Sequence, residues 1–171
     1  GNWERGVPVN QDRGDPPADF DGSGQCYVTE NGTDYPANDV DNGYAYLRSP
    51  VIDVSAGGTL HFAVWLNDYP AAPSGTMGPE DGLLVEYATD AAGTNWQTLR
   101  SYSGGLAAWR EETVEIGSEI PASATFHLRF TAYDIPPGDV VEAGVDAVSI
   151  TAFNCPAVGD GDFDSDGDVD L

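Results

Sequence analysis

The sequence contains no lysine. Its six basic residues are all arginines, against 29 aspartates and glutamates, which gives a formal net charge of −23 over 171 residues. Schiff-base chemistry, P-loop nucleotide binding and lysine–asparagine isopeptide crosslinks each need an ε-amine, so the sequence excludes them. A chain this acidic repels phosphate backbones and anionic lipid headgroups. Nucleic acids and membrane surfaces are therefore disfavoured partners, and cations are favoured ones.

Long hydrophobic runs are also missing. No apolar stretch approaches the roughly 20 residues that span a bilayer, and the amino terminus lacks the pattern of a signal peptide. The chain opens at Gly1 without an initiator methionine and stops inside a motif. We therefore expect a fragment of a longer protein whose export signal lay upstream, with no membrane insertion of its own.

Only two cysteines are present, Cys26 and Cys155. A disulfide between them closes a long loop and is worth about 2–4 kcal/mol. The alternative is a catalytic thiol working with His61 or His127, but neither cysteine has a recognisable nucleophile context. A disulfide places the protein outside the cytoplasm, as a secreted or cell-surface protein.

Short β-like segments separated by turn signals recur from residue 45 onward, after a region rich in Asp, Asn, Gly and Pro. The predicted strands are Tyr46–Val54, Thr59–Asn67, Gly82–Thr89, Trp96–Tyr102, Arg110–Ile116, Thr125–Tyr133 and Val140–Ala152. No stretch carries a helical period. The pattern predicts an all-β fold, a two-sheet antiparallel jelly-roll sandwich with long Asp/Gly-rich loops over residues 1–155.

Alternation of apolar and polar residues is clearest at Leu60–Leu66 and Phe126–Ala132. The intervening residues face outward, and they supply the candidate ligand-binding residues His61, Trp65, His127, Arg129 and Tyr133. If the two strands are neighbours in one sheet, these side chains form one polar-aromatic surface; the alternative is an ordinary solvated sheet face. Aromatic side chains that could stack on sugars are Trp65, Tyr69, Trp96, Trp109 and Tyr133.

Asp146 shares a face with Val148 and Ile150 if the last strand is regular. That face should be the core face. An ionised carboxylate pointing to the core is costly unless it is paired or holds a metal. With few arginines and no lysine to pair with it, a cation is the favoured partner of Asp146.

Two further sets of acidic residues have the spacing of calcium ligands. One lies in the loops, where the candidate ligands are Asp19, Asp21, Asp39 and Asp41, which with Asp146 offer enough oxygens for Ca²⁺; plain Asx-turns are the alternative. The other is the tail, residues 156–171, an acidic linker followed by part of an EF-hand-type loop with candidate ligands Asp162, Asp164, Asp166 and Asp170. The closing ligand of that loop falls beyond Leu171, so the tail should bind calcium weakly or not at all. An acidic disordered linker is the alternative for the tail.

The tail resembles the first half of a dockerin type I repeat, a likeness of about ten residues. The segments 24–27, 45–50 and 142–150, followed by Cys155, resemble a MAM-type domain, a jelly-roll sandwich related to the concanavalin A-like lectins. Such modules with dockerin-like tails are typical of large secreted proteins of planctomycete-like bacteria. The MAM resemblance implies that Asp146 is a metal ligand and that the module serves adhesion, oligomerisation or accessory substrate contact. The family's first strand, with its Phe-Glu ligand, is absent.

Catalysis is not expected. Glu111 and Glu112 are adjacent and point to opposite faces, and Glu86 stands alone, so a glycosidase pair is missing. His61 and His127 lack zinc-ligand spacing. The sequence thus predicts a non-catalytic, calcium-stabilised extracellular accessory module for adhesion or for contact with a glycan or protein. The alternative is a structural or anchoring subunit that acts through protein contacts, including self-association.

Overall fold

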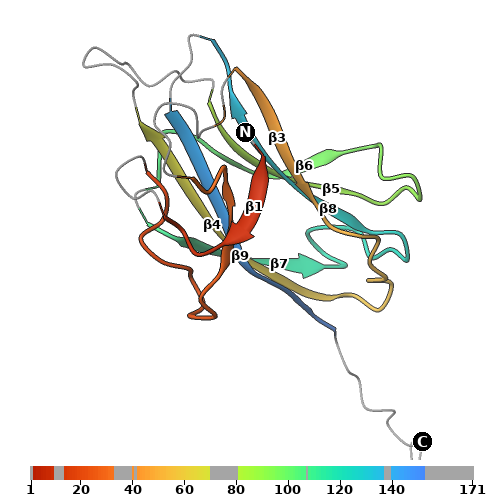
Figure 1. Ribbon diagram of the computed structural model, residues 1–171. Coiled ribbons are helices and arrows are strands. Elements are labelled where there is room, and N and C mark those ends of the chain that lie inside the picture. Colours follow the sequence, from red (N-terminus) through yellow and green to blue (C-terminus); the bar gives the residue numbers. More distant parts are fainter. Residues whose placement is uncertain are drawn as a thin grey trace, which may run out of the picture.

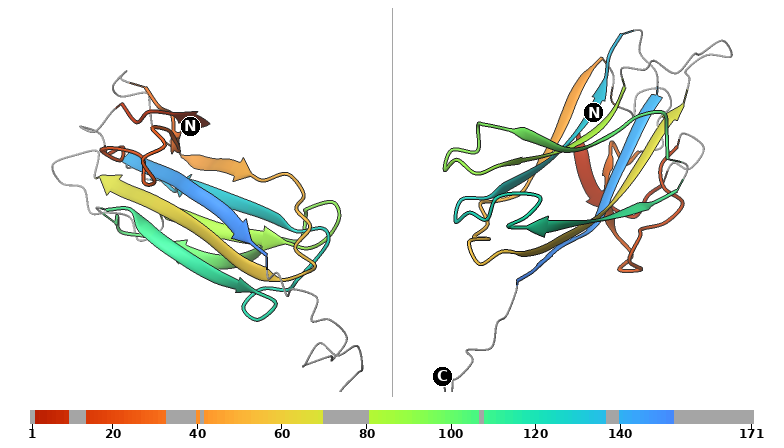
Figure 2. Two further views of the ribbon diagram at one scale, coloured as in Figure 1. Left: turned by 90° about the horizontal axis from the view of Figure 1, so that it is seen from below. Right: turned by 180° about the vertical axis from the view of Figure 1, so that it is seen from behind.

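Two antiparallel sheets packed face to face form the molecule (Figures 1 and 2). This computed structural model describes residues 2–9, 14–32, 40, 42–69, 81–106, 108–136 and 140–152. Its strands are β1 (Trp3–Gly6), β2 (Cys26–Thr29), β3 (Gly43–Arg48), β4 (Gly58–Tyr69), β5 (Gly82–Ala88), β6 (Gln97–Tyr102), β7 (Arg110–Ile116), β8 (His127–Asp134) and β9 (Val140–Thr151). The described residues contain no helix, and thus none that could span a membrane.

One sheet has the strand order β1-β2-β9-β4-β7 and the other the order β3-β8-β5-β6. All neighbouring strands within each sheet run antiparallel. The predicted jelly-roll sandwich is therefore confirmed. Each sheet has one face against the core and one outer face, and the two outer faces lie on opposite sides of the molecule (Figure 2).

The core lies between β4 and β8. On β4, Leu60, Phe62, Val64 and Leu66 are fully buried, and on β8 the same alternation buries Leu128 and Phe130. The rings of Phe62 and Phe130 meet edge to face at 5.6 Å between centroids, the arrangement that aromatic quadrupoles favour. The two alternating patterns read from the sequence are the two inner faces of the sandwich.

Because β4 and β8 belong to different sheets, their outward residues cannot share a surface. The single ligand surface expected from the sequence therefore does not exist. His61 and Trp65 lie on the outer face of the five-stranded sheet. His127, Arg129 and Tyr133 lie on the outer face of the four-stranded sheet, on the other side of the molecule.

Strand β9 contains a bulge at Ala147. Ala63 pairs with Asp146, but His61 pairs with Ser149, so β9 has one extra residue, and Ala147 has a φ of 50°. Before the bulge the odd-numbered residues of β9, such as Val145, face the core, and after it the even-numbered residues Val148 and Ile150 face inward. Asp146 consequently points away from the core, and the parity assumed from the sequence was wrong. Asp146 is nevertheless buried, with 8 % of its surface exposed.

The predicted strand Tyr46–Val54 is shorter in the structure. Strand β3 ends at Arg48, before Pro50, whose missing N–H cannot continue a ladder. The backbone then returns to the sheet for one bridge, between Ile52 and Phe126.

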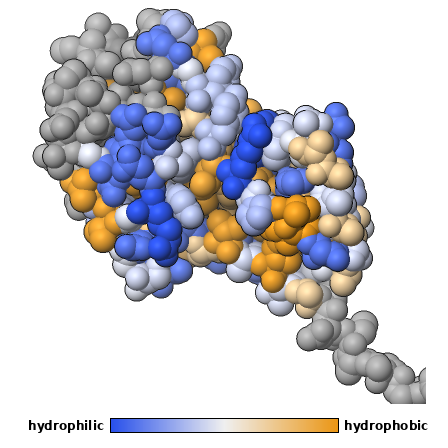
Figure 3. All heavy atoms as spheres, turned by 45° about the vertical axis from the view of Figure 1, so that its right-hand side comes forward, coloured by the Kyte–Doolittle hydropathy of each residue, from blue (hydrophilic) through white to orange (hydrophobic). Residues whose placement is uncertain are grey.

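An apolar seam runs between the sheets where β3 and β9 face each other. It consists of two cavities of about 170 and 230 Å³, and among their lining residues are Leu60, Leu128, Phe130 and Val148. In the described part of the chain, β9 beyond Asp146 pairs with β4 alone. Figure 3 shows hydrophobic residues gathered between hydrophilic ones on the surface of the molecule.

Candidate functional site

The segment 14–24 lies on the outer face of the five-stranded sheet. The Trp65 indole N–H donates to the Gly14 carbonyl at 2.7 Å, and the Trp109 indole N–H donates to the Ala18 carbonyl at 2.9 Å. The two indole rings meet edge to face at 6.1 Å. Trp65 is only 8 % exposed, so it is no ligand platform but an anchor for this segment.

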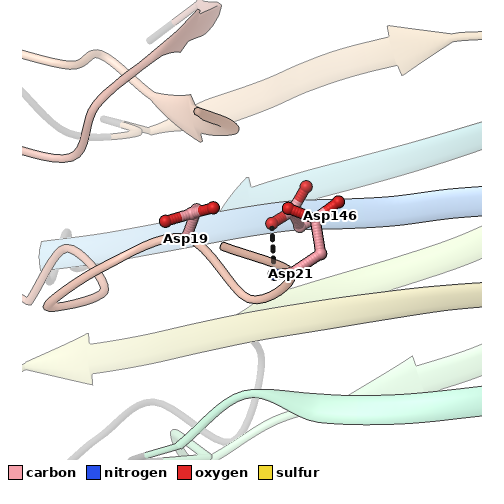
Figure 4. Close-up of side chains that lie close together, drawn as sticks. All are labelled: Asp19, Asp21 and Asp146. Atoms are coloured by element: carbon pink, nitrogen blue, oxygen red, sulfur yellow. Dashed lines mark hydrogen bonds between the residues drawn. The ribbon is translucent and has the colours of Figure 1, made fainter. Parts of the chain in front are cut away.

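Three carboxylates converge where this segment crosses β9. Asp19, Asp21 and Asp146 each offer an oxygen within 4.8 Å of the others (Figure 4). The backbone N–H groups of Phe20 and Asp21 donate to Asp146 Oδ2 at 2.7 and 3.3 Å, and the N–H of Ala147 donates to Oδ1 at 2.8 Å. These bonds fix the position of the segment on β9 and leave each carboxylate with free lone pairs.

The geometry of this cluster fits calcium. Ca²⁺ binds carboxylate and carbonyl oxygens at about 2.3–2.6 Å, so two ligands on opposite sides of the ion lie roughly 5 Å apart. Among the described residues, no arginine forms an ion pair with Asp19, Asp21 or Asp146. Three like charges this close repel unless a cation lies between them. Asp39, Asp41 and the four tail aspartates lie outside the described residues, so their roles stay predictions.

Backbone hydrogen bonds hold the carboxylates of Asp19 and Asp21 in place. The backbone N–H of Ser23 donates to Asp21 Oδ1 at 2.8 Å, and bonds from the Ser23 backbone and side chain lower the pKa of Asp21. The N–H of Gly24 donates to Asp19 Oδ2 at 2.8 Å. The bond of Asp21 is an Asx-turn, the alternative considered from the sequence, whereas the bond of Asp19 spans five residues. Both bonds are compatible with carboxylates that lie close to Asp146.

Cys26 lies beside this cluster, buried at the start of β2, and forms no disulfide with another of the described residues. Burial raises the pKa of Cys26 to about 12, and the charges of Asp146, Asp19 and Asp15 add to the effect. A thiol with so high a pKa is a poor nucleophile, which disfavours a catalytic cysteine. Cys155 lies outside the described residues, so the disulfide stays a prediction.

A second cluster covers the outer face of the four-stranded sheet. In the strand register Arg48 lies opposite Arg129, and Arg129 lies opposite Glu86. Arg129 donates to both Glu86 oxygens, from Nη2 to Oε1 at 2.7 Å and from Nε to Oε2 at 2.8 Å. The Thr131 hydroxyl donates to Glu86 Oε2 at 2.7 Å. Burial alone would raise the pKa of Glu86, but the bonds from Arg129 and Thr131 and the charges of both arginines outweigh it, so the pKa is lowered.

Tyrosine rings continue this face. Tyr44 stacks on Tyr46, with centroids 6.2 Å apart and planes 9° apart, and on Tyr133, with centroids 6.0 Å apart. Tyr44 is 56 % exposed and Tyr46 is 49 % exposed. Three roughly parallel rings thus lie across two neighbouring strands, β3 and β8.

Trp96 lies beside the arginines. The Arg129 guanidinium lies 4.1 Å from the centroid of the Trp96 ring and 5.1 Å from that of Tyr46. The Arg48 guanidinium lies 5.5 Å from each of the same two rings. Cation–π attraction therefore holds both guanidiniums between Tyr46 and Trp96.

The loop before Trp96 is closed by Asp90. Its carboxylate accepts the backbone N–H groups of Asn95 at 2.9 Å and Thr94 at 3.0 Å. These bonds lower the pKa of Asp90 to about 2. The loop that positions Trp96 is thus held by an ionised aspartate at any pH well above 2.

The sequence named only part of this face. Arg129 and Tyr133 lie on it as expected, while His127 lies beneath the loop, with its ring against Trp96 and close to Gly93. Tyr44, Tyr46 and Arg48 were missed as ligand candidates. Alternate residues of β3 face outward, so the pattern Tyr-x-Tyr-x-Arg was the available signal.

The fold and the two clusters define an acidic antiparallel β-sandwich with a carboxylate cluster on one side and a face of tyrosines, Trp96 and arginines on the other. No protein-family model matches the chain, and no curated protein sequence matches it. The resemblances to MAM-type domains and dockerin repeats therefore stay predictions.

Solved structures similar to the chain include a cleaved adhesin domain of Lys-gingipain from Porphyromonas gingivalis, at 21% identity over 88% of this chain and 91% of that one, with a TM-score of 0.46. Others are TmCBM61 in complex with beta-1,4-galactotriose, at 9% identity over 88% of each chain and a TM-score of 0.39, and the CBM22-2 xylan-binding domain of Xyn10C from Paenibacillus barcinonensis, at 17% identity over 90% of this chain and 92% of that one, also with a TM-score of 0.39. At these TM-scores the similarities assign no function to this chain.

Proposed function

We propose that this chain is a non-catalytic extracellular contact module that binds a glycan on the outer face of the four-stranded sheet and is stabilised by calcium. The observation that carries the proposal is the exposed set of rings on β3 and β8, Tyr44, Tyr46 and Tyr133, beside two guanidiniums. Aromatic faces stack on the apolar C–H faces of sugars, and arginines donate hydrogen bonds to hydroxyls. We name this surface, made of Tyr44, Tyr46, Tyr133, Trp96, Arg48 and Arg129, the aromatic–arginine face.

A non-catalytic role is supported by the way the candidate acids are held. Glu86 accepts three hydrogen bonds from Arg129 and Thr131, and its pKa is lowered, so it cannot serve as a general acid near neutral pH. Glu112 accepts bonds from Arg100 at 3.1 Å and Arg110 at 2.6 Å. Glycoside hydrolysis needs one carboxyl group with a raised pKa, and neither of these two has one.

Calcium stabilisation is supported by the convergence of Asp19, Asp21 and Asp146. The ion would join the segment 14–24 to strand β9 and would replace three-way carboxylate repulsion with attraction. In this role it stabilises the module rather than taking part in chemistry. Location outside the cell, where calcium is abundant, fits the same proposal.

Isothermal titration of the module with a panel of oligosaccharides tests glycan binding at this face. Tyr44→Ala and Tyr46→Ala should each weaken binding about tenfold or more, the loss typical of removing a stacked ring. Phe20→Ala is the matched control, because Phe20 is also exposed (37 %) but lies in the segment 14–24, over the outer face of the other sheet. Binding that survives both face variants and falls with Phe20→Ala would place the site elsewhere.

A second candidate function is an anchoring subunit that binds another protein strand. The apolar seam and the single-sided pairing of β9 beyond Asp146 favour it, because a free strand edge beside apolar pockets suits strand addition. Val148 lines both seam cavities and is 47 % exposed. Sedimentation of the protein and of Val148→Asp tests this function: a concentration-dependent dimer that is lost in the variant supports it, and a monomer at all concentrations contradicts self-association.

A further inference from the structure

The charged row across the aromatic–arginine face contains two guanidiniums and one carboxylate. Arg48, Arg129 and Glu86 are direct cross-strand neighbours on β3, β8 and β5. Like charges directly opposite each other on a sheet are destabilising. One carboxylate can offset one of the two arginines, and the structure shows which.

Glu86 is fully engaged by Arg129. Both carboxylate oxygens accept bonds from that guanidinium, at 2.7 and 2.8 Å, and Oε2 also accepts the hydroxyl of Thr131. The pair is largely shielded from water, with side-chain exposures of 12 % for Arg129 and 10 % for Glu86. The bidentate geometry makes this a strong, oriented pair. Among the described residues, the ion pair of Glu86 is with Arg129 and not with Arg48.

Arg48 has no carboxylate partner among the residues that the structure describes. Its side chain is exposed, yet it is not loose, because Tyr46 and Trp96 each lie 5.5 Å from its guanidinium. A guanidinium oriented by rings loses little entropy when it binds a planar anion. This arginine is the unmatched charge of the row.

We infer that the ligand of the aromatic–arginine face is a largely neutral glycan that carries one carboxylate, such as a single uronic acid, which pairs with Arg48 while the neighbouring sugars lie on Tyr44 and Tyr46. This inference rests on the proposed function and deepens it by naming the ligand class. The carboxylate of the ligand would complete the row as two opposite-charge pairs.

Charge favours one carboxylate over many. The chain carries a net charge of −23, so a polyanion is repelled along its length. An isolated carboxylate at Arg48 is affected mainly by charges within the Debye length, about 8 Å at physiological ionic strength. The three charges of the row itself, on Arg48, Arg129 and Glu86, sum to one positive charge.

The composition of the face favours a glycan over an acidic peptide. The large hydrophobic side chains that are exposed on it are Tyr44 and Tyr46. Protein interfaces also use tyrosine, tryptophan and arginine as anchors but seat them in well-packed, desolvated pockets, whereas sugars stack on flat, exposed rings. The exposed tyrosine rings on β3 therefore favour a glycan as the ligand.

The test compares oligosaccharides that carry one glucuronic acid with the same molecules after reduction of the carboxylate to a primary alcohol. The unmodified protein should bind the acidic form about tenfold tighter or more, the range of a charge-assisted hydrogen bond. Arg48→Gln should abolish that preference and leave the affinity for the reduced form within about twofold. Arg5→Gln is the matched control: it removes one exposed charge from β1 and should keep the preference.

The outcomes separate this inference from the proposed function. Equal binding of the two forms by the unmodified protein overturns the inference and leaves glycan binding standing. An equal loss for both forms in Arg48→Gln, with unchanged melting, also overturns it, since Arg48 would then act only by packing on Tyr46 and Trp96. Binding of an acidic peptide with no binding of any oligosaccharide overturns both.

Discussion

The change Asp146→Asn should lower the stability of the protein strongly in calcium and only slightly in its absence. An ion that binds only the folded state stabilises it by RT ln(1 + [Ca²⁺]/Kd), about 2.7 kcal/mol at one hundred times Kd. For a domain of this size each kcal/mol shifts the melting midpoint by roughly 2–4 °C. Saturating calcium should therefore raise the midpoint of the unmodified protein by roughly 5–10 °C, and Asp146→Asn should lose most of that gain.

In chelator the same substitution should cost little. The asparagine oxygen still accepts a backbone N–H, and removing one charge relieves the repulsion with Asp19 and Asp21, which lie within 4.8 Å. Against this stands the loss of one of the two acceptor oxygens that Asp146 offers to the backbone, worth about 1 kcal/mol. The variant and the unmodified protein should thus melt within a few degrees of each other in chelator, by roughly the shift that 1 kcal/mol produces.

Melting followed by circular dichroism in calcium and in chelator measures both effects. Tryptophan fluorescence adds a local readout, because Trp65 and Trp109 anchor the segment that carries the carboxylates. Asp53→Asn is the matched control, since Asp53 also accepts hydrogen bonds within a turn, from Ser55, but lies in no carboxylate cluster among the described residues. A midpoint of the unmodified protein that is equal in calcium and in chelator would refute the reasoning.

Three further predictions concern other parts of the molecule. The pKa of Glu86 is lowered from its ordinary value of 4.5 in the folded protein, so the stability that its charge contributes is present above pH 4.5 and is lost as the pH falls through the folded-state pKa. In Glu86→Gln the free energy of unfolding should therefore fall less steeply as the pH is lowered through this range. An unchanged pH dependence would contradict the role of the pair with Arg129. A Cβ on Gly144 would lie 2.9 Å from the Trp109 ring, so Gly144→Ala should cost about 1–3 kcal/mol in chemical denaturation, and an unaffected midpoint would count against this packing. Mass spectrometry of the unreduced chain should show Cys26 joined to Cys155; two alkylatable thiols would rule the disulfide out.

The fold was readable from the sequence because the core depends on local alternation. Leu60–Leu66 and Phe126–Ala132 each repeat with period two, and burial of apolar side chains forces that period onto one face. Alternation gives the face of a residue within its strand but not the sheet to which the strand belongs. For that reason the sequence left open whether Trp65 and Arg129 share a surface, and the structure places their strands in different sheets.

The sequence predicted the members of the carboxylate cluster, but it did not predict how Asp146 reaches the cluster. Asp19 and Asp21 were found from their turn spacing, and Asp146 from an assumed regular strand. The bulge at Ala147 breaks that regularity, and no glycine marks it in the sequence. Asp146 reaches the cluster from the outer face, where the segment 14–24 covers it, rather than from the core.

The carboxylate cluster and the aromatic–arginine face lie on opposite outer faces of the sandwich, with the whole packed core between them (Figure 2). Two sites influence each other's affinity only when each ligand favours a different state of the intervening structure. The two sheets pack through one continuous buried core, so we expect the coupling free energy between calcium and glycan to be near zero. Calcium would then lengthen the survival of the module among extracellular proteases, by suppressing local opening of the segment 14–24, without changing how tightly a folded copy holds its ligand.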